Sequence, residues 1–153
     1  MEGKTCCVTG HRDIPPDRIP EVLGALEREV SIAVREGYTR FISGFAEGAD
    51  LLFAEAAVLW TGSRPEYSLV AALPYRGRLE CCDPAFRRLL RRCDEVHVLS
   101  ERCSRECFLA RDRWMVNESG LVIGVWDGRR SGGTAYTLRY AKSLGRQVRI
   151  IRI

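Results

Sequence analysis

The turn that begins at Ser43 combines two glycines, Gly44 and Gly48, with two acidic side chains, Glu47 and Asp50. It lies between a short apolar run and a helix-forming stretch. Such a strand-to-helix turn leaves the first N–H groups of the helix unpaired, and the helix dipole favours an anion there. Glycine has no Cβ, so a phosphate can approach the backbone closely. We expect this turn to bind a ligand through its backbone N–H groups, which would contact a phosphate. The two carboxylates compete with the phosphate for these N–H groups, and they could also accept hydrogen bonds from ribose hydroxyls.

Two further turns carry glycines and polar side chains after apolar runs. Hydroxyls and paired glycines at a helix start offer donors to phosphate or ribose oxygens, and an arginine adds a bidentate cation. Neither turn contains a dinucleotide fingerprint or a P-loop. Each turn alone could be structural, whereas three at one edge of a sheet predict a shared pocket. The residues expected to bind the ligand from these two turns are Thr9, Gly10, His11, Arg12, Asp127, Gly132, Gly133 and Thr134.

Histidine, tryptophan and cysteine offer weaker signals. His11 is placed in an exposed loop, where it could act as an acid or base near neutral pH, bind, or do neither. His97 alternates with valines and is expected in the core. Trp126 could stack on a base or pack in the core. The 7 cysteines include no C-x-x-C pair, so we expect reduced thiols and no metal site.

The chain is basic, with a formal net charge of +4. A basic chain can bind nucleic acid, but this excess is modest and spread along the sequence. The one dense patch is expected on one side of a helix, where a solvated face is the simpler explanation. We therefore regard nucleic acid as an unlikely partner. The patch consists of Arg87, Arg88, Arg91 and Arg92.

No apolar run approaches the length of a membrane span, and a strand follows the first few residues directly. We therefore expect no signal peptide, no membrane partner and a cytoplasmic location. Apolar positions on helix surfaces could serve a homo-oligomer or the core, and the sequence does not separate these two uses.

Short apolar runs alternate with longer amphipathic segments along the chain. Near-continuous apolar strands suit a parallel sheet covered on both faces. We predict a single α/β domain over residues 1–153. Its fold is expected to be a Rossmann-like three-layer α/β/α sandwich with a mostly parallel sheet of about six strands. Such sheets bind ligands beyond the carboxyl ends of their strands. Strands are expected at 5–9, 39–43, 67–73, 95–99, 121–126 and 147–153, and helices at 21–36, 51–60, 82–92, 104–115 and 133–144.

Four blocks of sequence resemble the YpsA-like branch of the SLOG superfamily, which groups the DNA-processing protein Smf/DprA with the LOG-type phosphoribohydrolases. The similarity covers nearly the whole chain. It implies a Rossmann-like domain that binds nucleotides or nucleotide-derived ligands. The blocks are Thr9-Gly10-His11-Arg12, Ser43-Gly44 with Gly48-Ala49-Asp50, Arg113-Trp114-Met115-Val116-Asn117, and Val125-Trp126-Asp127-Gly128 leading to Gly132-Gly133-Thr134.

The resemblance also bears on catalysis. LOG-type enzymes carry an arginine four residues before a methionine, which implies that Arg111 before Met115 takes that position. Their glycine-rich motif ends in a glutamate, but this chain places Thr137 there. A hydroxyl cannot replace a carboxylate that stabilises a cationic transition state or activates water. The resemblance therefore implies a retained binding frame without the hydrolytic apparatus.

We weigh three functions. The first is a nucleotide-binding sensor or regulator with no certain cofactor and a ligand such as ADP-ribose, NAD or a nucleoside phosphate. The second is a hydrolase that cleaves a nucleotide N-glycosidic or phosphate bond, with Asp50, Glu55 or Arg111 as catalytic candidates. The third is single-stranded DNA binding through the arginine patch, which should weaken steeply with salt.

Overall fold

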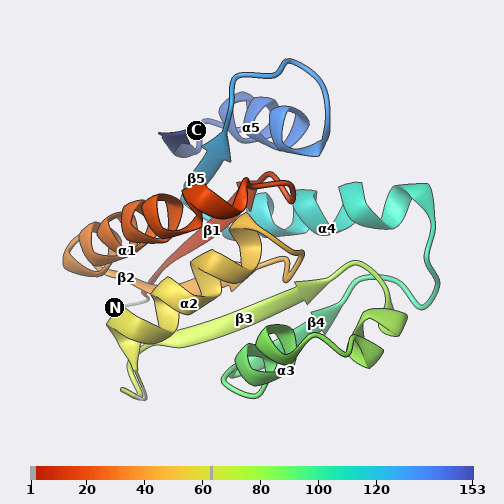
Figure 1. Cartoon of the computed structure of the whole chain (residues 1–153), viewed down its shortest axis with the longest axis horizontal. Helices are drawn as coiled ribbons and strands as arrows, with labels where there is room; N and C mark the ends of the chain where they lie inside the picture. The colour runs from red at the N-terminus through yellow and green to blue at the C-terminus, as the bar shows by residue number, and fades with distance from the viewer. Residues whose placement is uncertain (1–2, 63) are drawn as a thin grey trace.

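A six-stranded sheet forms the centre of the protein, and all of its strand pairs are parallel (Figure 1). The computed structural model describes residues 3–62 and 64–153. The strand order is β4-β3-β2-β1-β5-β6. The predicted Rossmann-like α/β fold is confirmed. The strands are β1 (Lys4–Gly10), β2 (Tyr38–Ser43), β3 (Ser68–Leu73), β4 (Glu95–Val98), β5 (Leu121–Trp126) and β6 (Gln147–Arg152).

Helices cover both faces of the sheet, as a parallel sheet requires. Helices α1 (Ile19–Arg35), α2 (Ala49–Thr61) and α3 (Pro84–Leu90) pack on one face. Helices α4 (Arg105–Glu118) and α5 (Gly133–Ser143) pack on the other. Two short 3₁₀ helices, η1 (Pro16–Arg18) and η2 (Arg76–Glu80), lie in the connections. No helix among the described residues is both long and apolar enough to cross a bilayer.

The strand order reverses beside β1, and this reversal positions the functional site. The chain moves outward from β1 through β2 and β3 to β4, and then returns to place β5 on the other side of β1. The last paired residues of these two central strands are Gly10 and Val125. The loops that follow β1 and β5 therefore diverge from neighbouring strand ends, which is where doubly wound sheets form ligand crevices.

Local sequence accounts for the elements that frame this crevice. Residues of β1 point to alternate faces, so Cys6 and Val8 enter one core cluster and Cys7 the other. Helix α1 ends where Gly37 adopts a φ of +95° and its N–H bonds to a carbonyl of the last turn. The Ser104 side chain accepts a hydrogen bond from the N–H of Cys107 and caps α4, as the sequence indicates.

Two expectations near the β4 edge are wrong. Helix α3 ends at Leu90 rather than at residue 92, so Arg92 lies beyond the helix, while Arg91 is its C-cap and still bonds to the carbonyl of Arg87. The chain closes there in a tighter turn, with the N–H of Arg92 bonded to Leu89. His97 is exposed rather than in the core, because β4 is an edge strand; its ring contacts Glu95 and Trp114.

Candidate functional site

A cavity of about 340 Å³ opens at the carboxyl edge of the sheet, at the point where the strand order reverses. It brings together residues from all three turns singled out in the sequence. It also receives three side chains from the first turns of α4 that the sequence did not indicate, those of Phe108, Leu109 and Asp112. The predicted ligand-binding residues that line it are Thr9, Gly10, His11, Arg12, Asp50, Gly132, Gly133 and Thr134, and the catalytic candidate Arg111 lines it too.

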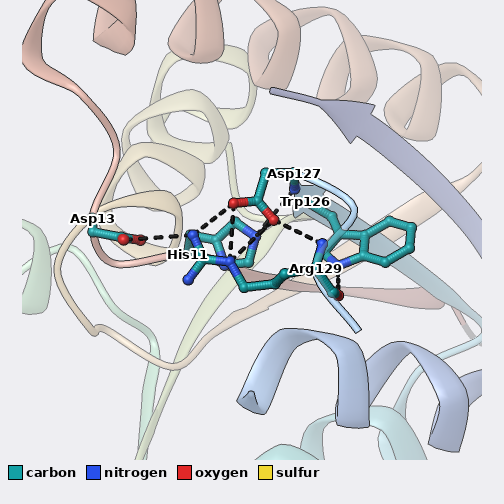
Figure 2. Close-up of polar contacts among 5 residues, drawn as sticks. All are labelled: His11, Asp13, Trp126, Asp127 and Arg129. Carbon is teal, nitrogen blue, oxygen red and sulfur yellow. Dashed lines mark hydrogen bonds and ion pairs between the residues drawn. The ribbon is translucent and has the colours of Figure 1, made fainter. Parts of the chain in front are cut away.

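Asp127 ties the loops after β1 and β5 together across the crevice (Figure 2). Its carboxylate lies 3.1 Å from Nε2 of His11 and accepts hydrogen bonds from the backbone and guanidinium of Arg129. These bonds from Arg129, together with the charge of His11, hold the pKa of Asp127 well below its usual range. Asp127 is therefore an anion that orders the loop. It does not line the cavity itself.

His11 is buried, with 6% of its surface exposed, so the expectation of an exposed loop histidine is wrong. The adjacency of β1 and β5 encloses it. Its Nε2 has two neighbours at 3.1 Å, the N–H and the carboxylate of Asp127. One nitrogen cannot serve both, because it accepts from the N–H only without a proton and donates to the carboxylate only with one. The site thus offers Nε2 a partner whether or not that nitrogen carries a proton.

The turn after β2 uses three of its N–H groups in bonds within the protein. The N–H of Phe45 bonds to Oγ of Ser43 at 3.2 Å, and the N–H of Ala46 bonds to the Asp50 carboxylate at 3.3 Å. The N–H of Ala49 bonds to the carbonyl of His11 at 3.1 Å. Three of the donors that the sequence assigned to a phosphate are thus already paired. The Asp50 carboxylate therefore competes with a phosphate for an N–H group of this turn, as the sequence suggests.

Asp50 and Arg111 are buried neighbours that both line the cavity. The Asp50 side chain is buried, and this burial raises its pKa from 3.8 to about 6; the nearby charge of Arg111 offsets part of the effect. Arg111 is also buried and donates to the carbonyl of Gly44 at 2.8 Å and to Asp112 at 2.7 Å. A Cβ at Gly44 would lie only 2.6 Å from Nη1 of Arg111. Glycine at this position therefore accommodates the pair.

Two other glycines of the site are also explained by contacts within the protein. A Cβ at Gly10 would lie 2.3 Å from the Cβ of Ala49. At Gly48, which has a φ of +79°, a Cβ would lie 2.5 Å from the carbonyl oxygen of His11. These glycines let the start of α2 pack directly on the loop after β1. Phe45, beside them, adopts a φ of +56°, a strained conformation for a side chain of this size.

The start of α5 differs, because its glycines face open space. Gly132 and Gly133 are exposed and line the cavity, and a Cβ at either would meet nothing within 4 Å. The φ of +97° at Gly132 explains a glycine there. Gly133 has neither a positive φ nor a close neighbour, so nothing in the protein's own packing requires it. No side chain caps this helix start.

Asp112 is a functional candidate that the sequence did not indicate. It lines the cavity from α4 and lies 3.3 Å from the hydroxyl of Thr137, which itself donates to the carbonyl of Gly133 at 2.8 Å. A carboxylate therefore stands next to the position where the LOG-type motif would place its glutamate. The signal available in the sequence was only an acidic residue directly after Arg111.

A smaller cavity of about 80 Å³ adjoins the first one and shares Arg12, Ala46, Phe108 and Arg111 with it. The predicted residues Gly44 and Glu47 line this smaller cavity. Arg12 lies with its guanidinium 5.4 Å from the centre of the Phe108 ring. In the part of the chain that the structure describes, Arg12 has no acidic partner, so its charge is available to an anion.

Four predicted residues lie outside both cavities, and Asp127, described above, is one of them. Ser43 is buried; its hydroxyl donates to the carbonyl of Asp50 at 2.8 Å and thereby fixes the turn. Gly48 packs against the loop after β1. Glu55 lies farther along α2 and forms an ion pair with Arg88. Within residues 3–62 and 64–153, no group of three His, Cys, Asp or Glu side chains forms a candidate metal site.

Comparison with solved structures identifies the same fold in other proteins. The X-ray structure of TM1055, a structural genomics target, superposes with a TM-score of 0.61 and 18% sequence identity over 95% of this chain and 72% of that chain. DNA processing protein A from Helicobacter pylori, described for its single-stranded DNA binding mode, gives a TM-score of 0.65 and 20% identity over 97% of this chain.

The chain spans 65% of the length of DNA processing protein A. At these identities the likeness shows the fold alone, and it confirms the fold implied by the SLOG resemblance. No family model matches the chain, and no curated protein matches it.

Proposed function

We propose that this protein binds a phosphate-bearing nucleotide, or a ligand derived from one, in the cavity at the carboxyl edge of its sheet. The observation that carries the proposal is Gly133. It is an open glycine at an uncapped helix start, facing a cavity that Arg12 and Arg111 also line. An anion at this point would meet unpaired N–H groups, the positive end of the α5 dipole and an available guanidinium.

The ligand class follows from the donors and acceptors around the cavity. Cationic and N–H donors suit phosphate, while Asp50 and Asp112 can accept from ribose hydroxyls. ADP-ribose, NAD, AMP and cyclic nucleotides share this combination. From the four sequence blocks that resemble it, we further propose that the protein belongs to the YpsA-like branch and acts as a sensor or regulator in the cytoplasm, as a monomer or homo-oligomer.

Calorimetric titration against those four ligand types tests the proposal. Gly133→Ala should weaken binding of the ligand that wild type binds by about 10- to 100-fold, which corresponds to losing one hydrogen bond to a charged group, about 1.5–3 kcal/mol. Gly24→Ala in α1 is the matched control, because a Cβ there has only one neighbour, at 3.8 Å. Absence of binding by folded wild type, or equal affinity in the Gly133 variant, contradicts the proposal.

A second candidate, hydrolysis of the N-glycosidic bond, gains support from two carboxyl groups in one cavity. Asp50, with a pKa of about 6, would protonate the departing base, while Asp112 takes a proton from the water that attacks the anomeric carbon. The C–N bond breaks as the C–O bond forms. Chromatography should then detect free base with wild type and with the control Glu55→Gln, but not with Asp50→Asn or Asp112→Asn. Product from both aspartate variants rules out this assignment.

Single-stranded DNA binding remains an alternative because DNA processing protein A is described for it. Arg91 and Arg92 are exposed, whereas Arg88 is engaged by Glu55. Fluorescence anisotropy with a labelled oligonucleotide should show binding at low salt that falls steeply as salt rises. It should weaken in an Arg91→Glu, Arg92→Glu double variant. Flat or absent binding at low salt eliminates this function.

A further inference from the structure

A third concavity, separate from the two cavities at the strand ends, lies between α5 and the edge strand β6. Its volume is about 310 Å³. It shares no lining residue with the cavity at the strand ends. We call it the α5–β6 groove; its lining residues are Trp126, Arg130, Ala135, Leu138, Arg139, Lys142 and Ile150.

The floor of the α5–β6 groove is apolar and tightly built. Gly124 of β5 lies beneath it, and a Cβ there would lie 2.7 Å from Leu138 and 3.2 Å from Ile150. The absence of a side chain at Gly124 thus lets these two residues pack down. Ile150 nevertheless remains 40% exposed, because β6 is an edge strand with no neighbour on its outer side.

The rim of the groove is positive. Arg130, Arg139 and Lys142 are exposed, and among the described residues none of them forms an ion pair with an acid. Arg149 of β6 shows the contrast, since it is paired with Glu29 and Glu36 near α1. An apolar floor ringed by uncompensated cations complements an apolar group flanked by carboxylates.

The edge of β6 indicates that the occupant is a polypeptide. Strand β6 is the last in the sheet order and pairs with β5. Its outer N–H and C=O groups can be matched by another extended chain, as in β-strand addition. A strand placed there would direct alternate side chains over Ile150, the residue of β6 that lines the groove.

A nucleic acid and a second copy fit less well. Trp126 is the one aromatic residue among those lining the groove, and the guanidinium of Arg152 lies 5.6 Å from its ring centre. One ring face is therefore already occupied, which disfavours base stacking. Two copies meeting through this groove would bring like charges together.

We propose that the α5–β6 groove binds an extended segment of a partner protein that carries a bulky apolar side chain with acidic residues on either side. The segment pairs with β6 as a seventh strand. Its apolar side chain fills the groove, and its carboxylates contact Arg139 and Lys142. This inference stands independently of the nucleotide proposal.

Peptide phage display against the whole protein tests it. The selected peptides should share a bulky apolar residue flanked by Asp or Glu. Their affinity, measured by fluorescence polarisation, should fall at least tenfold in Ile150→Glu and in Lys142→Glu. Leu59→Glu is the matched control because Leu59 is an exposed leucine on α2, at 63% exposure. Melting curves verify that each variant is folded.

Hydrogen exchange supplies the second readout. A bound peptide should slow exchange of amides in β6 and leave the start of α5 unchanged. The proposal is overturned if the selected peptides are basic, if none is enriched, or if their affinity ignores both groove variants. It is also overturned if a single-stranded oligonucleotide displaces them, or if a second copy of the chain occupies the groove.

Discussion

Burial of Asp50 predicts a dependence of stability on pH that is opposite to that of ordinary surface carboxylates. The folded protein holds the Asp50 proton up to a pH of about 6, whereas the unfolded chain releases it near 3.8. Between these values the folded state binds more protons, so the free energy of unfolding falls as the pH rises. The full difference in pKa corresponds to about 3 kcal/mol.

Asp50→Asn isolates this contribution because asparagine keeps the shape and an acceptor oxygen for the N–H of Ala46 but does not titrate. Urea unfolding should be measured from pH 4 to pH 7.5 for both proteins. The advantage of wild type over the variant should shrink by up to about 3 kcal/mol across that range.

Glu21→Gln serves as the control of opposite sign. Hydrogen bonding to Arg18 lowers the pKa of Glu21, so its contribution should be present at neutral pH and disappear as the pH falls. A wild-type advantage over Asp50→Asn that does not change with pH would refute the reasoning, because it would mean that Asp50 is ionised as readily as in the unfolded chain.

Three further predictions concern the frame of the site. Gly44→Ala should destabilise the fold by about 1–3 kcal/mol in urea unfolding, because its Cβ would displace Arg111; full stability would contradict the packing role. Ser104→Ala should lower stability by about 1 kcal/mol through loss of the α4 cap, while Ser31→Ala, the control on α1, changes it less. Asp127→Asn should speed amide exchange in the loop after β5 at pH 7. The effect should disappear as the pH falls well below 4, because protonation of Asp127 removes the same charge from wild type. Unchanged exchange at pH 7 contradicts the proposal that the Asp127 carboxylate orders this loop.

The fold was predictable because its signals are local. Apolar runs of strand length, separated by helices and short links, identify the layers without knowledge of which strands are neighbours. The signal fails at β4, where alternation of valines around His97 looks the same for a central strand and for an exposed edge. It also misplaces the end of α3, because helix continuation and a closing turn differ by only a few hydrogen bonds.

The site was predictable only in part, because its chemistry depends on contacts between distant segments. Burial of His11 results from the pairing of β1 with β5. The carboxylate of Asp112 reaches the neighbourhood of Thr137 from another helix. Glycines at the turns look equivalent in sequence, yet Gly44 accommodates Arg111 whereas Gly133 faces open space. That difference changes which turn is expected to meet the phosphate.

We propose that the phosphate contacts the start of α5 rather than the turn after β2. Amide chemical shifts of isotope-labelled protein, titrated with AMP and with ADP-ribose, test it most directly. We expect the largest shifts at Gly133, Thr134 and Ala135, with smaller ones at Gly44 and Ala46. The largest shifts in the turn after β2, or no shifts with either ligand, would contradict it.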